Sequence, residues 1–210
     1  MEPRQACAII VAGGHSRRLG RDKRRLRLWG DDQPTLLERT VALARRLCPE
    51  VLVVLNDPAD WAGLPARLVP DAWPDAGPLG GIASGLRAAA PGAEWALVLA
   101  ADLPLLSERL LAGLLAHPCA GEAVVPRQDD PSRIEPLLAL YRRSCLAGLE
   151  SYLAAGRRKA TDWAAALDAC WLDPPAWRRW DPAGWSFLNL NTPDQLDLAR
   201  AHLQQRSGAL

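Results

Sequence analysis

The sequence lacks three features that would each define a protein class. No run of 18 apolar residues, the length a membrane-spanning helix needs, occurs in its 210 residues. The cysteines form no C-x-x-C pair or His/Cys metal-ligand spacing, and their number is odd. We therefore expect a soluble cytoplasmic protein that does not interact with membranes. Its cysteines are expected to be free buried thiols in a reducing compartment: Cys7, Cys48, Cys119, Cys145 and Cys170.

Net charge is also nearly absent, at +1, but the charge is unevenly distributed. Residues 17–27 carry seven Lys and Arg against Asp22 alone, whereas the rest of the chain has 18 basic and 23 acidic residues. One concentrated basic segment suits a small polyanion better than a nucleic-acid backbone, which needs an extended basic stripe. Nucleic-acid binding is not expected.

The basic segment follows an apolar run, residues 6–12, and a glycine pair, Gly13-Gly14. This order predicts a buried strand that leads into a phosphate-binding loop. Adjacent glycines let backbone N–H groups approach an anion without Cβ interference. Arg17, Arg18 and Lys23 supply charge-assisted donors. The alternative is a glycine-rich turn beside a solvated basic face.

Two common glycine-loop motifs do not fit this loop. Five residues separate Gly14 from Gly20, where a P-loop has four, and Arg21 follows in place of Lys-Ser/Thr. The dinucleotide-binding pattern G-x-G-x-x-G is also missing. The loop therefore belongs to neither of these classes.

Apolar runs alternate with helical patterns along the chain, which predicts a single α/β domain over residues 1–210. Strands are expected at residues 6–12, 51–55, 67–69, 95–101, 122–126 and 134–141, with Pro136 limiting the last to an edge or bulge. Helices are expected at residues 34–48, 82–90 and 107–116, twice within 144–167, and from Pro193 to about Gln205. Five tryptophans between residues 163 and 185 are interpreted as covering a small core around irregular backbone.

Polar residues follow several of these strands, where α/β sheets bind ligands. Asn56 is a candidate for ribose or base contact, although it can equally cap its own turn. Asp71 begins a segment whose Gly77, Gly80 and Gly81 predict a tight loop close to a ligand, or simply a loop before a helix. Asp102 offers the hard oxygen that Mg²⁺ needs beside phosphates; a turn or N-cap role is the alternative.

The C-terminal segment F-L-N-L-N-T-P-D-Q predicts a strand that leads into a helix. Thr192, Pro193 and Gln195 have the spacing of a capping box with proline at the first helical position. Asn189 and Asn191 alternate outward just before this helix N-terminus, a place suited to an anionic ligand. Amides that only stabilise a turn are the alternative interpretation.

Four segments together resemble the molybdenum cofactor guanylyltransferases, a family of nucleotidyltransferases. They are V-A-G-G-H-S-R-R-L-G-R-D-K, D-A-W-P-D-A-G-P-L-G-G, A-D-L-P and F-L-N-L-N-T-P, in the family's order across almost the whole chain. Val11 and Leu19 replace the usual Leu and Met, and both changes are tolerated by volume. The resemblance implies a three-layer α/β/α fold with a mostly parallel, Rossmann-like sheet.

The resemblance also implies transfer of GMP from Mg-GTP to molybdopterin, with Mg²⁺ as cofactor and pyrophosphate as product. It implies catalytic roles for Arg17, Lys23 and Asp102 and metal binding by Asp102, and places Asn189 and Asn191 on the acceptor side. Molybdenum cofactor insertion proteins or apo-molybdoenzymes are implied as transient partners. The expected nucleotide-binding set is Val11, Ala12, Gly13, Gly14, Ser16, Lys23, Asn56, Asp71, Gly77, Gly80 and Asp102.

Two other functions stay open at this point. The same fold serves cytidylyltransferases and sugar-phosphate nucleotidyltransferases, although cytidylyl relatives more often carry A-A-G where this chain has Ala12-Gly13-Gly14. A non-catalytic carrier of the molybdenum cofactor is the alternative from another class. Such a carrier does not need a metal-binding carboxylate that faces a triphosphate cradle.

Overall fold

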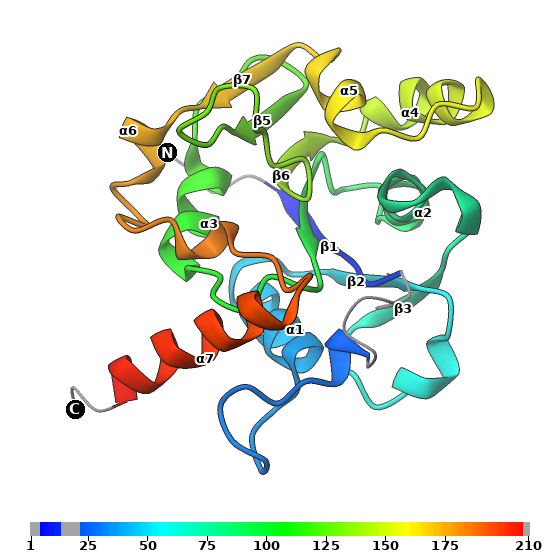
Figure 1. Ribbon diagram of the computed structural model, residues 1–210. Helices are drawn as coiled ribbons and strands as arrows, with labels where there is room; N and C mark the ends of the chain where they lie inside the picture. The colour runs from blue at the N-terminus through cyan, green and yellow to red at the C-terminus, as the bar shows by residue number, and fades with distance from the viewer. Residues whose placement is uncertain (1–4, 14–21, 208–210) are drawn as a thin grey trace.

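The computed structural model describes residues 5–13 and 22–207, and its strands form one seven-stranded sheet (Figure 1). The strands are β1 (Ala6–Val11), β2 (Val51–Leu55), β3 (Arg67–Pro70), β4 (Trp95–Ala100), β5 (Ala123–Pro126), β6 (Leu138–Arg142) and β7 (Ala169–Leu172). The α-helices are α1 (Leu36–Leu47), α2 (Pro78–Ala88), α3 (Glu108–Ala116), α4 (Cys145–Ala154), α5 (Ala160–Ala165), α6 (Pro174–Trp177) and α7 (Pro193–Ser207). Short 3-10 helices are η1 (Lys23–Arg25), η2 (Pro58–Trp61), η3 (Pro74–Ala76) and η4 (Trp185–Phe187).

The strand order is β3-β2-β1-β4-β6-β5-β7. Only β6 runs antiparallel to its neighbours, and the other strand pairs are parallel. The strands β1, β2 and β4 are buried along their whole length, which explains why their sequences are aliphatic without alternation. The predicted mostly parallel α/β fold is confirmed.

Each face of the sheet has its own hydrophobic core. On one face Ala8 and Ile10 of β1 share a core with Leu37 and Val41 of α1, and α3 joins it. On the other face Ile9 packs with residues of α2, α4 and α5. Figure 1 shows α1 on the opposite side of the sheet from α2 and α4. The predicted three layers follow from this division.

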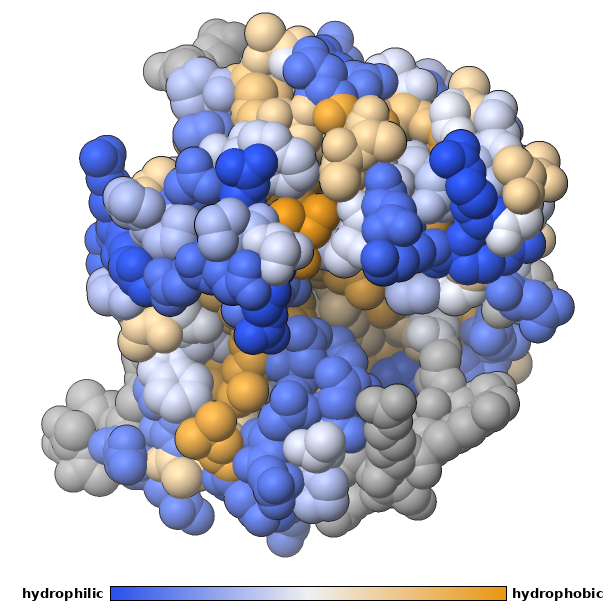
Figure 2. All heavy atoms as spheres, turned by 45° about the horizontal axis from the view of Figure 1, so that its top comes forward, coloured by the Kyte–Doolittle hydropathy of each residue, from blue (hydrophilic) through white to orange (hydrophobic). Residues whose placement is uncertain are grey.

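The surface offers little apolar area. Figure 2 shows a face with many hydrophilic residues, with apolar residues in a hollow near its centre, in a strip at the lower left and along the top. Among the described residues, Leu198 is the large apolar side chain that is substantially exposed. None of the helices in the described parts of the chain has the length and apolar character needed to cross a membrane.

Helix α2 begins at Pro78, four residues before the predicted start, so Gly80 and Gly81 lie in the helix and not in a loop. Tertiary packing explains the glycines. A Cβ on Gly80 would lie 2.3 Å from the Trp73 carbonyl oxygen, and one on Gly81 would lie 2.7 Å from Cγ1 of Val11. The loop interpretation is therefore wrong for both residues, and a nucleotide contact at Gly80 stays a prediction.

Strand β6 lies inside the sheet, between β4 and β5, so the prediction of an edge strand is wrong. Pro136 does not disturb the ladder because β6 begins two residues later, at Leu138. The Pro136 carbonyl instead accepts a 2.9 Å hydrogen bond from the buried Tyr141 hydroxyl. Pro136 therefore lies before β6 and not within it.

The tryptophan-rich segment contains a strand, β7, that the sequence did not predict. The expectation of core-covering indoles is confirmed for Trp163 and Trp177, which are both buried. Trp177 also donates from Nε1 to the Arg127 carbonyl oxygen at 2.8 Å. A four-residue strand at the edge of the sheet carries too little periodicity to stand out from the sequence.

Two of the five cysteines are joined, so the prediction that all are free thiols is wrong. Cys119 and Cys170 form a disulfide with a Cα–Cα distance of 5.8 Å. They are 51 residues apart, and only the pairing of β5 with β7 brings them together. Burial raises the pKa of each of the remaining thiols to about 12, as expected for unreactive cysteines: Cys7, Cys48 and Cys145.

Candidate active site

A cleft opens at the carboxyl ends of β1 and β4. It is lined by residues that include Ala12, Gly13, Lys23, Pro78 and Asp102. The chain runs from β1 toward β3 on one side of this point and continues from β4 on the other, so the strand order reverses here. Open α/β sheets bind their ligands at such a reversal, because the loops that follow the two strands diverge.

Three of the predicted site residues meet at this cleft. The Lys23 ammonium lies 3.0 Å from Oδ2 of Asp102 and donates to Oδ1 of Asn191 at 2.8 Å. The Lys23 and Asp102 side chains are 16% and 25% exposed, so the ion pair is largely shielded but still open to the cleft. Asp102 and Asn191 are 79 and 168 positions from Lys23 in the sequence, yet the three residues form one cluster.

A small third hydrophobic core explains why these segments converge. Leu26 and Leu28, just after Lys23, pack with Leu190 and with Leu196 of α7. The Leu190 N–H also donates to the Asp102 carbonyl oxygen at 3.0 Å. Apolar residues on both chain segments therefore bring Lys23 and Asn191 to Asp102.

The predicted capping box at α7 is confirmed. Thr192 Oγ1 accepts from the Gln195 N–H at 3.3 Å, and Gln195 Oε1 accepts from the Thr192 N–H at 3.0 Å. Gln195 Oε1 also accepts from the Asn191 N–H at 2.7 Å, which holds Asn191 in place. The strand expected before this helix is absent, since residues 188–191 are irregular. Asn189 donates locally to the Phe187 carbonyl oxygen at 3.4 Å.

A second group of predicted residues lies beside Gly13. A Cβ placed on Gly13 would lie 3.8 Å from Oδ2 of Asp71 and 3.9 Å from Nδ2 of Asn56. Asp71 is held by two 2.9 Å bonds to Oδ1, from the Ser84 hydroxyl and the Trp73 N–H. Its Oδ2 faces Gly13 instead. This arrangement leaves a carboxylate and an amide at the end of β1 for a ligand.

The backbone of Ala12 already has protein partners. Its N–H donates to the Val54 carbonyl oxygen at 2.8 Å, and its carbonyl oxygen accepts from Arg24 at 3.2 Å. The Val11 carbonyl oxygen accepts from the Ala101 N–H at 3.1 Å. These bonds fix the end of β1, and the predicted nucleotide contacts of Val11, Ala12 and Gly13 stay predictions.

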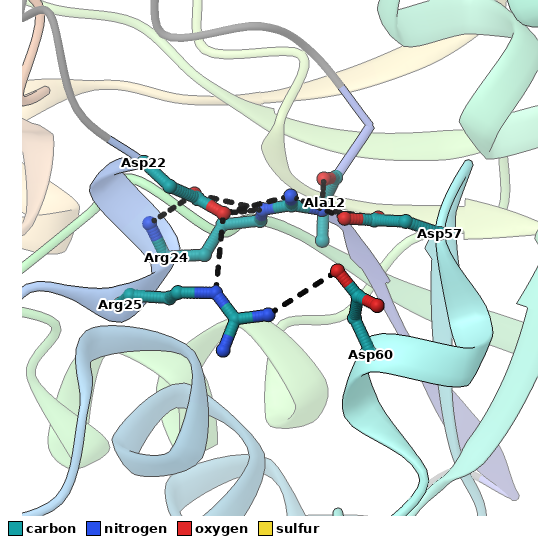
Figure 3. Close-up of polar contacts among 6 residues, drawn as sticks. All are labelled: Ala12, Asp22, Arg24, Arg25, Asp57 and Asp60. Carbon is teal, nitrogen blue, oxygen red and sulfur yellow. Dashed lines mark hydrogen bonds and ion pairs between the residues drawn. The ribbon is translucent and has the colours of Figure 1, made fainter.

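Arg24 is a feature of the site that the sequence did not single out. It lies next to Lys23 and is tied to Asp22, Asp57 and the Ala12 carbonyl oxygen (Figure 3). Burial disfavours its charge, but hydrogen bonds from Arg24 to Asp57 and Asp22 outweigh burial and raise the Arg24 pKa. The hydrogen bond from Arg24 lowers the pKa of Asp57 in turn. In the sequence, Arg24 is one of many basic residues, and nothing marks it.

Glu135 is the second such residue. It precedes Leu137, which lines the cleft, and its carboxylate accepts a hydrogen bond from Gln128. Burial raises the Glu135 pKa, the Gln128 hydrogen bond opposes this, and the charge of Asp102 adds to the rise. The Glu135 carboxylate, whose pKa the charge of Asp102 raises, lies on the β4–β6 side of the cleft.

The donor set of the cleft fits magnesium bound mainly through a substrate. Within the described residues no group of three or more His, Cys, Asp or Glu side chains could hold a metal by itself. Mg²⁺ typically binds one or two carboxylates together with substrate phosphates and water. Asp102 offers one such carboxylate, and the adjacent Lys23 ammonium suits the phosphates.

The structure thus places most of the predicted residues at one edge of the sheet. Lys23, Asp102 and Asn191 touch, and Asn56 and Asp71 lie beside Gly13. Gly77 precedes α2 with a positive φ of 62°, a conformation that favours glycine. Gly14, Ser16 and Arg17 lie outside the described residues.

Comparison with known proteins identifies close relatives. The model of the family described as MobA-like NTP transferase domain matches residues 8–170. A probable molybdenum cofactor guanylyltransferase from Chloroflexus aggregans is 52% identical over 198 residues, which cover 93% of each chain. A molybdenum cofactor guanylyltransferase from Desulfosudis oleivorans is 32% identical, over 93% of this chain and 95% of its own.

A solved structure shares the fold. Molybdopterin-guanine dinucleotide biosynthesis protein A from Archaeoglobus fulgidus superposes with a TM-score of 0.80 at 26% identity. The match covers 95% of this chain and 99% of that one. The likeness thus extends over both halves of the sheet and over the cleft between them.

Proposed function

The chain belongs to the MobA-like NTP transferase family and is a nucleotidyltransferase, and from this we propose that it transfers GMP from Mg-GTP to molybdopterin. The products are the guanine dinucleotide form of the cofactor and pyrophosphate. The relatives named as molybdenum cofactor guanylyltransferases support this choice of substrates. We further propose that the protein acts in the cytoplasm and passes its product on by transient contact with insertion proteins or apo-molybdoenzymes.

The junction of Lys23, Asp102 and Asn191 is the observation that carries this proposal. It joins a cation, a carboxylate and an amide from three distant segments at the reversal of strand order. A triphosphate requires the cation, and an approaching acceptor benefits from a hydrogen-bonding side chain on the opposite wall. A protein that only carries a bound cofactor has no need for all three at one point.

The proposed reaction is a direct displacement. An oxygen of the terminal phosphate of molybdopterin attacks the α-phosphorus of GTP, a new P–O bond forms, and the bond from α-phosphorus to the bridging oxygen breaks. The electron pair of that bond leaves with pyrophosphate. Such transfers depend on positioning and charge stabilisation and need no enzyme nucleophile. The three free cysteines are not among the described residues that line the cleft, and burial raises their pKa values.

The predicted site residues have separate roles in that displacement. Lys23 leaves its pairing with Asp102 to donate to the triphosphate and offsets its charge. Asn56 donates and accepts hydrogen bonds with the guanine or ribose, Asp71 accepts hydrogen bonds from them, and Asn191 orients the acceptor. Arg17, Gly14 and Ser16 complete the proposed phosphate contacts. Asp102 is the residue proposed to hold Mg²⁺, which when bound neutralises triphosphate charge and orients it.

The experiment is a pyrophosphate-release assay with GTP, CTP, ATP and UTP, each with and without molybdopterin, in the presence of Mg²⁺. The proposal predicts release that depends on both GTP and molybdopterin. Preference for CTP would support a cytidylyltransferase, and release with a sugar phosphate as acceptor would support a sugar-phosphate enzyme. Binding of molybdopterin without any release would support a carrier. Each of these three results would contradict the proposed function.

A further inference from the structure

Arg24 forms charged hydrogen bonds with two carboxylates, those of Asp57 and Asp22, beside the cleft (Figure 3). Its Nη1 and Nη2 donate to the two carboxylate oxygens of Asp57, both at 2.7 Å. Its Nε and Nη2 donate to Asp22 at 2.9 and 2.8 Å. The guanidinium carbon also lies 5.5 Å from the centre of the Trp61 ring.

The geometry requires arginine specifically. Two parallel N–H donors, on Nη1 and Nη2, match the two oxygens of Asp57, while the Nε/Nη2 edge of the planar group reaches Asp22. A lysine ammonium is a compact point charge and cannot bridge both carboxylates in this way. The Arg24 side chain is 15% exposed, whereas that of the adjacent Arg25 is 52% exposed.

The residues next to Arg24 and Asp57 in the sequence are both predicted to contact the nucleotide. Arg24 directly follows Lys23, the proposed phosphate contact, and Asp57 directly follows Asn56, a proposed base contact. The two carboxylate bonds therefore join the backbone at the phosphate end of the cleft to the backbone at the base end. The Ala12 carbonyl oxygen, bound by Arg24 at 3.2 Å, adds the end of β1 to the same unit.

We propose that Arg24, through Asp57, is a positioning residue that sets the separation between the base-contacting and phosphate-contacting groups for the intact nucleotide. The proposal rests on the proposed function, because it assigns the ends of the cleft to base and phosphate. Arg24 lines the cleft, but its guanidinium donates to Asp57, Asp22 and the Ala12 carbonyl oxygen. Its bonds to Asp57 tie the residue after Lys23 to the residue after Asn56.

A fixed spacing benefits only a ligand that occupies both ends at once. When two binding groups are held at the right distance, the second contact of a linked ligand forms without a new loss of freedom. A nucleoside or a free triphosphate occupies one end and gains nothing from the spacing. Loosening the spacing should therefore weaken GTP binding much more than fragment binding.

The test compares Arg24→Lys and Asp57→Asn with Arg25→Lys as the matched control. Arg25 is in the same 3-10 helix and carries the same charge, but its contacts with Asp22 and Asp60 are longer, at 3.8 and 3.4 Å. Calorimetry in one Mg²⁺ buffer measures the Kd of GTP, guanosine and inorganic tripolyphosphate for each full-length variant. Thermal melting and the KM and kcat of pyrophosphate release are recorded alongside.

We expect both variants at the ion pair to bind GTP about tenfold more weakly and each fragment within about threefold of wild type. KM for GTP should rise more than kcat falls, and Arg25→Lys should match wild type. An unchanged Kd for GTP in both variants would overturn the proposal. So would a loss for GTP and both fragments by the same factor, which is the signature of a merely structural role.

Failure of the proposed function gives a different result. If wild type releases pyrophosphate from CTP in preference to GTP, the function is wrong, and the same comparison with CTP, cytidine and tripolyphosphate still tests the ion pair. If Arg24→Lys does not fold, Asp57→Asn, which keeps the arginine, decides the question. A wild-type protein that binds no nucleoside triphosphate would overturn both proposals.

Discussion

The two halves of the sheet, β1 to β3 and β4 to β7, are held together in different ways. The first half has parallel strands, and charged contacts such as Arg24 with Asp57 join its carboxyl ends. The second half contains the antiparallel β6, the Cys119–Cys170 disulfide and three buried tryptophans, Trp95, Trp163 and Trp177. The cleft lies where the halves meet, so it combines a polar wall with one supported by apolar packing.

We infer from this difference that one side of the cleft binds the nucleotide and the other side binds the acceptor. Lys23, Asn56 and Asp71 on the first half suit a nucleotide, because they offer charge and hydrogen bonds at the ends of parallel strands. On the other side, Asn191 and Glu135 come from segments outside the parallel core. We therefore expect substitutions on the two sides to affect GTP and the acceptor differently.

The largest expected effect is at the point shared by both halves. Lys23→Met and Asp102→Asn should each lower kcat of pyrophosphate release roughly 100-fold or more, because each removes a charge next to the triphosphate. Lys159→Met is the control, since Lys159 is exposed and pairs only locally with Asp162. If Asp102→Asn kept most of the turnover with Mg²⁺ present, the metal role of Asp102 would be wrong.

The next prediction distinguishes Asn191 from Asn189, which the sequence analysis places together on the acceptor side. Asn191→Ala should raise KM for molybdopterin about tenfold, with KM for GTP little changed, because Asn191 lies beside the Lys23–Asp102 pair. Asn189→Ala should have a smaller effect, since Asn189 bonds to the Phe187 carbonyl oxygen nearby in the chain. Steady-state kinetics with both substrates varied makes the distinction, and equal effects of the two changes would contradict it.

A third prediction concerns stability at the start of α2. Gly80→Ala should lower the free energy of unfolding by roughly 1–3 kcal/mol, because the new methyl group would meet the Trp73 backbone. Gly148→Ala in α4 is the matched control: nothing lies within 4 Å of a Cβ there, and alanine favours a helix. Urea denaturation of both variants measures the difference. An unaffected Gly80→Ala protein would show that close packing does not explain this glycine.

The smallest effect is a pH dependence on the β4–β6 side. Burial raises the pKa of Glu135, so ionisation destabilises the folded protein once the pH exceeds the unfolded value of about 4.3. Glu135→Gln removes this charge and can still accept from Gln128. Its melting temperature should exceed that of wild type near pH 7 and match it near pH 4. A difference that is the same at both pH values would contradict the raised pKa.

The first half of the fold was the more predictable half. Its strands β1 and β2 are uninterrupted aliphatic runs, and Asn56 and Asp71 follow β2 and β3. Asp102 follows the equally aliphatic β4 across the junction, so topology alone brings these residues to one edge. The capping box at Thr192 was equally clear, because its spacing is local. Local patterns and the general behaviour of parallel sheets therefore predicted most of the site.

The predictions from sequence were wrong at positions whose structure depends on contacts between residues far apart in the chain. Nothing local shows that Gly80 packs on Trp73, that Cys119 meets Cys170, or that β6 lies inside the sheet. Arg24 was overlooked for the same reason, because its partner Asp57 is 33 positions away in a different turn. Glu135 gains its raised pKa from burial and from the charge of Asp102, and only the fold supplies both.

The most direct test of the central claim is a crystal structure with a non-hydrolysable GTP analogue and Mn²⁺ in place of Mg²⁺. We predict an anomalous manganese peak in coordination distance of the Asp102 carboxylate, with the phosphates at Lys23 and the guanine beside Asn56 and Asp71. An analogue bound away from the β1–β4 junction, or manganese held without Asp102, would contradict the account.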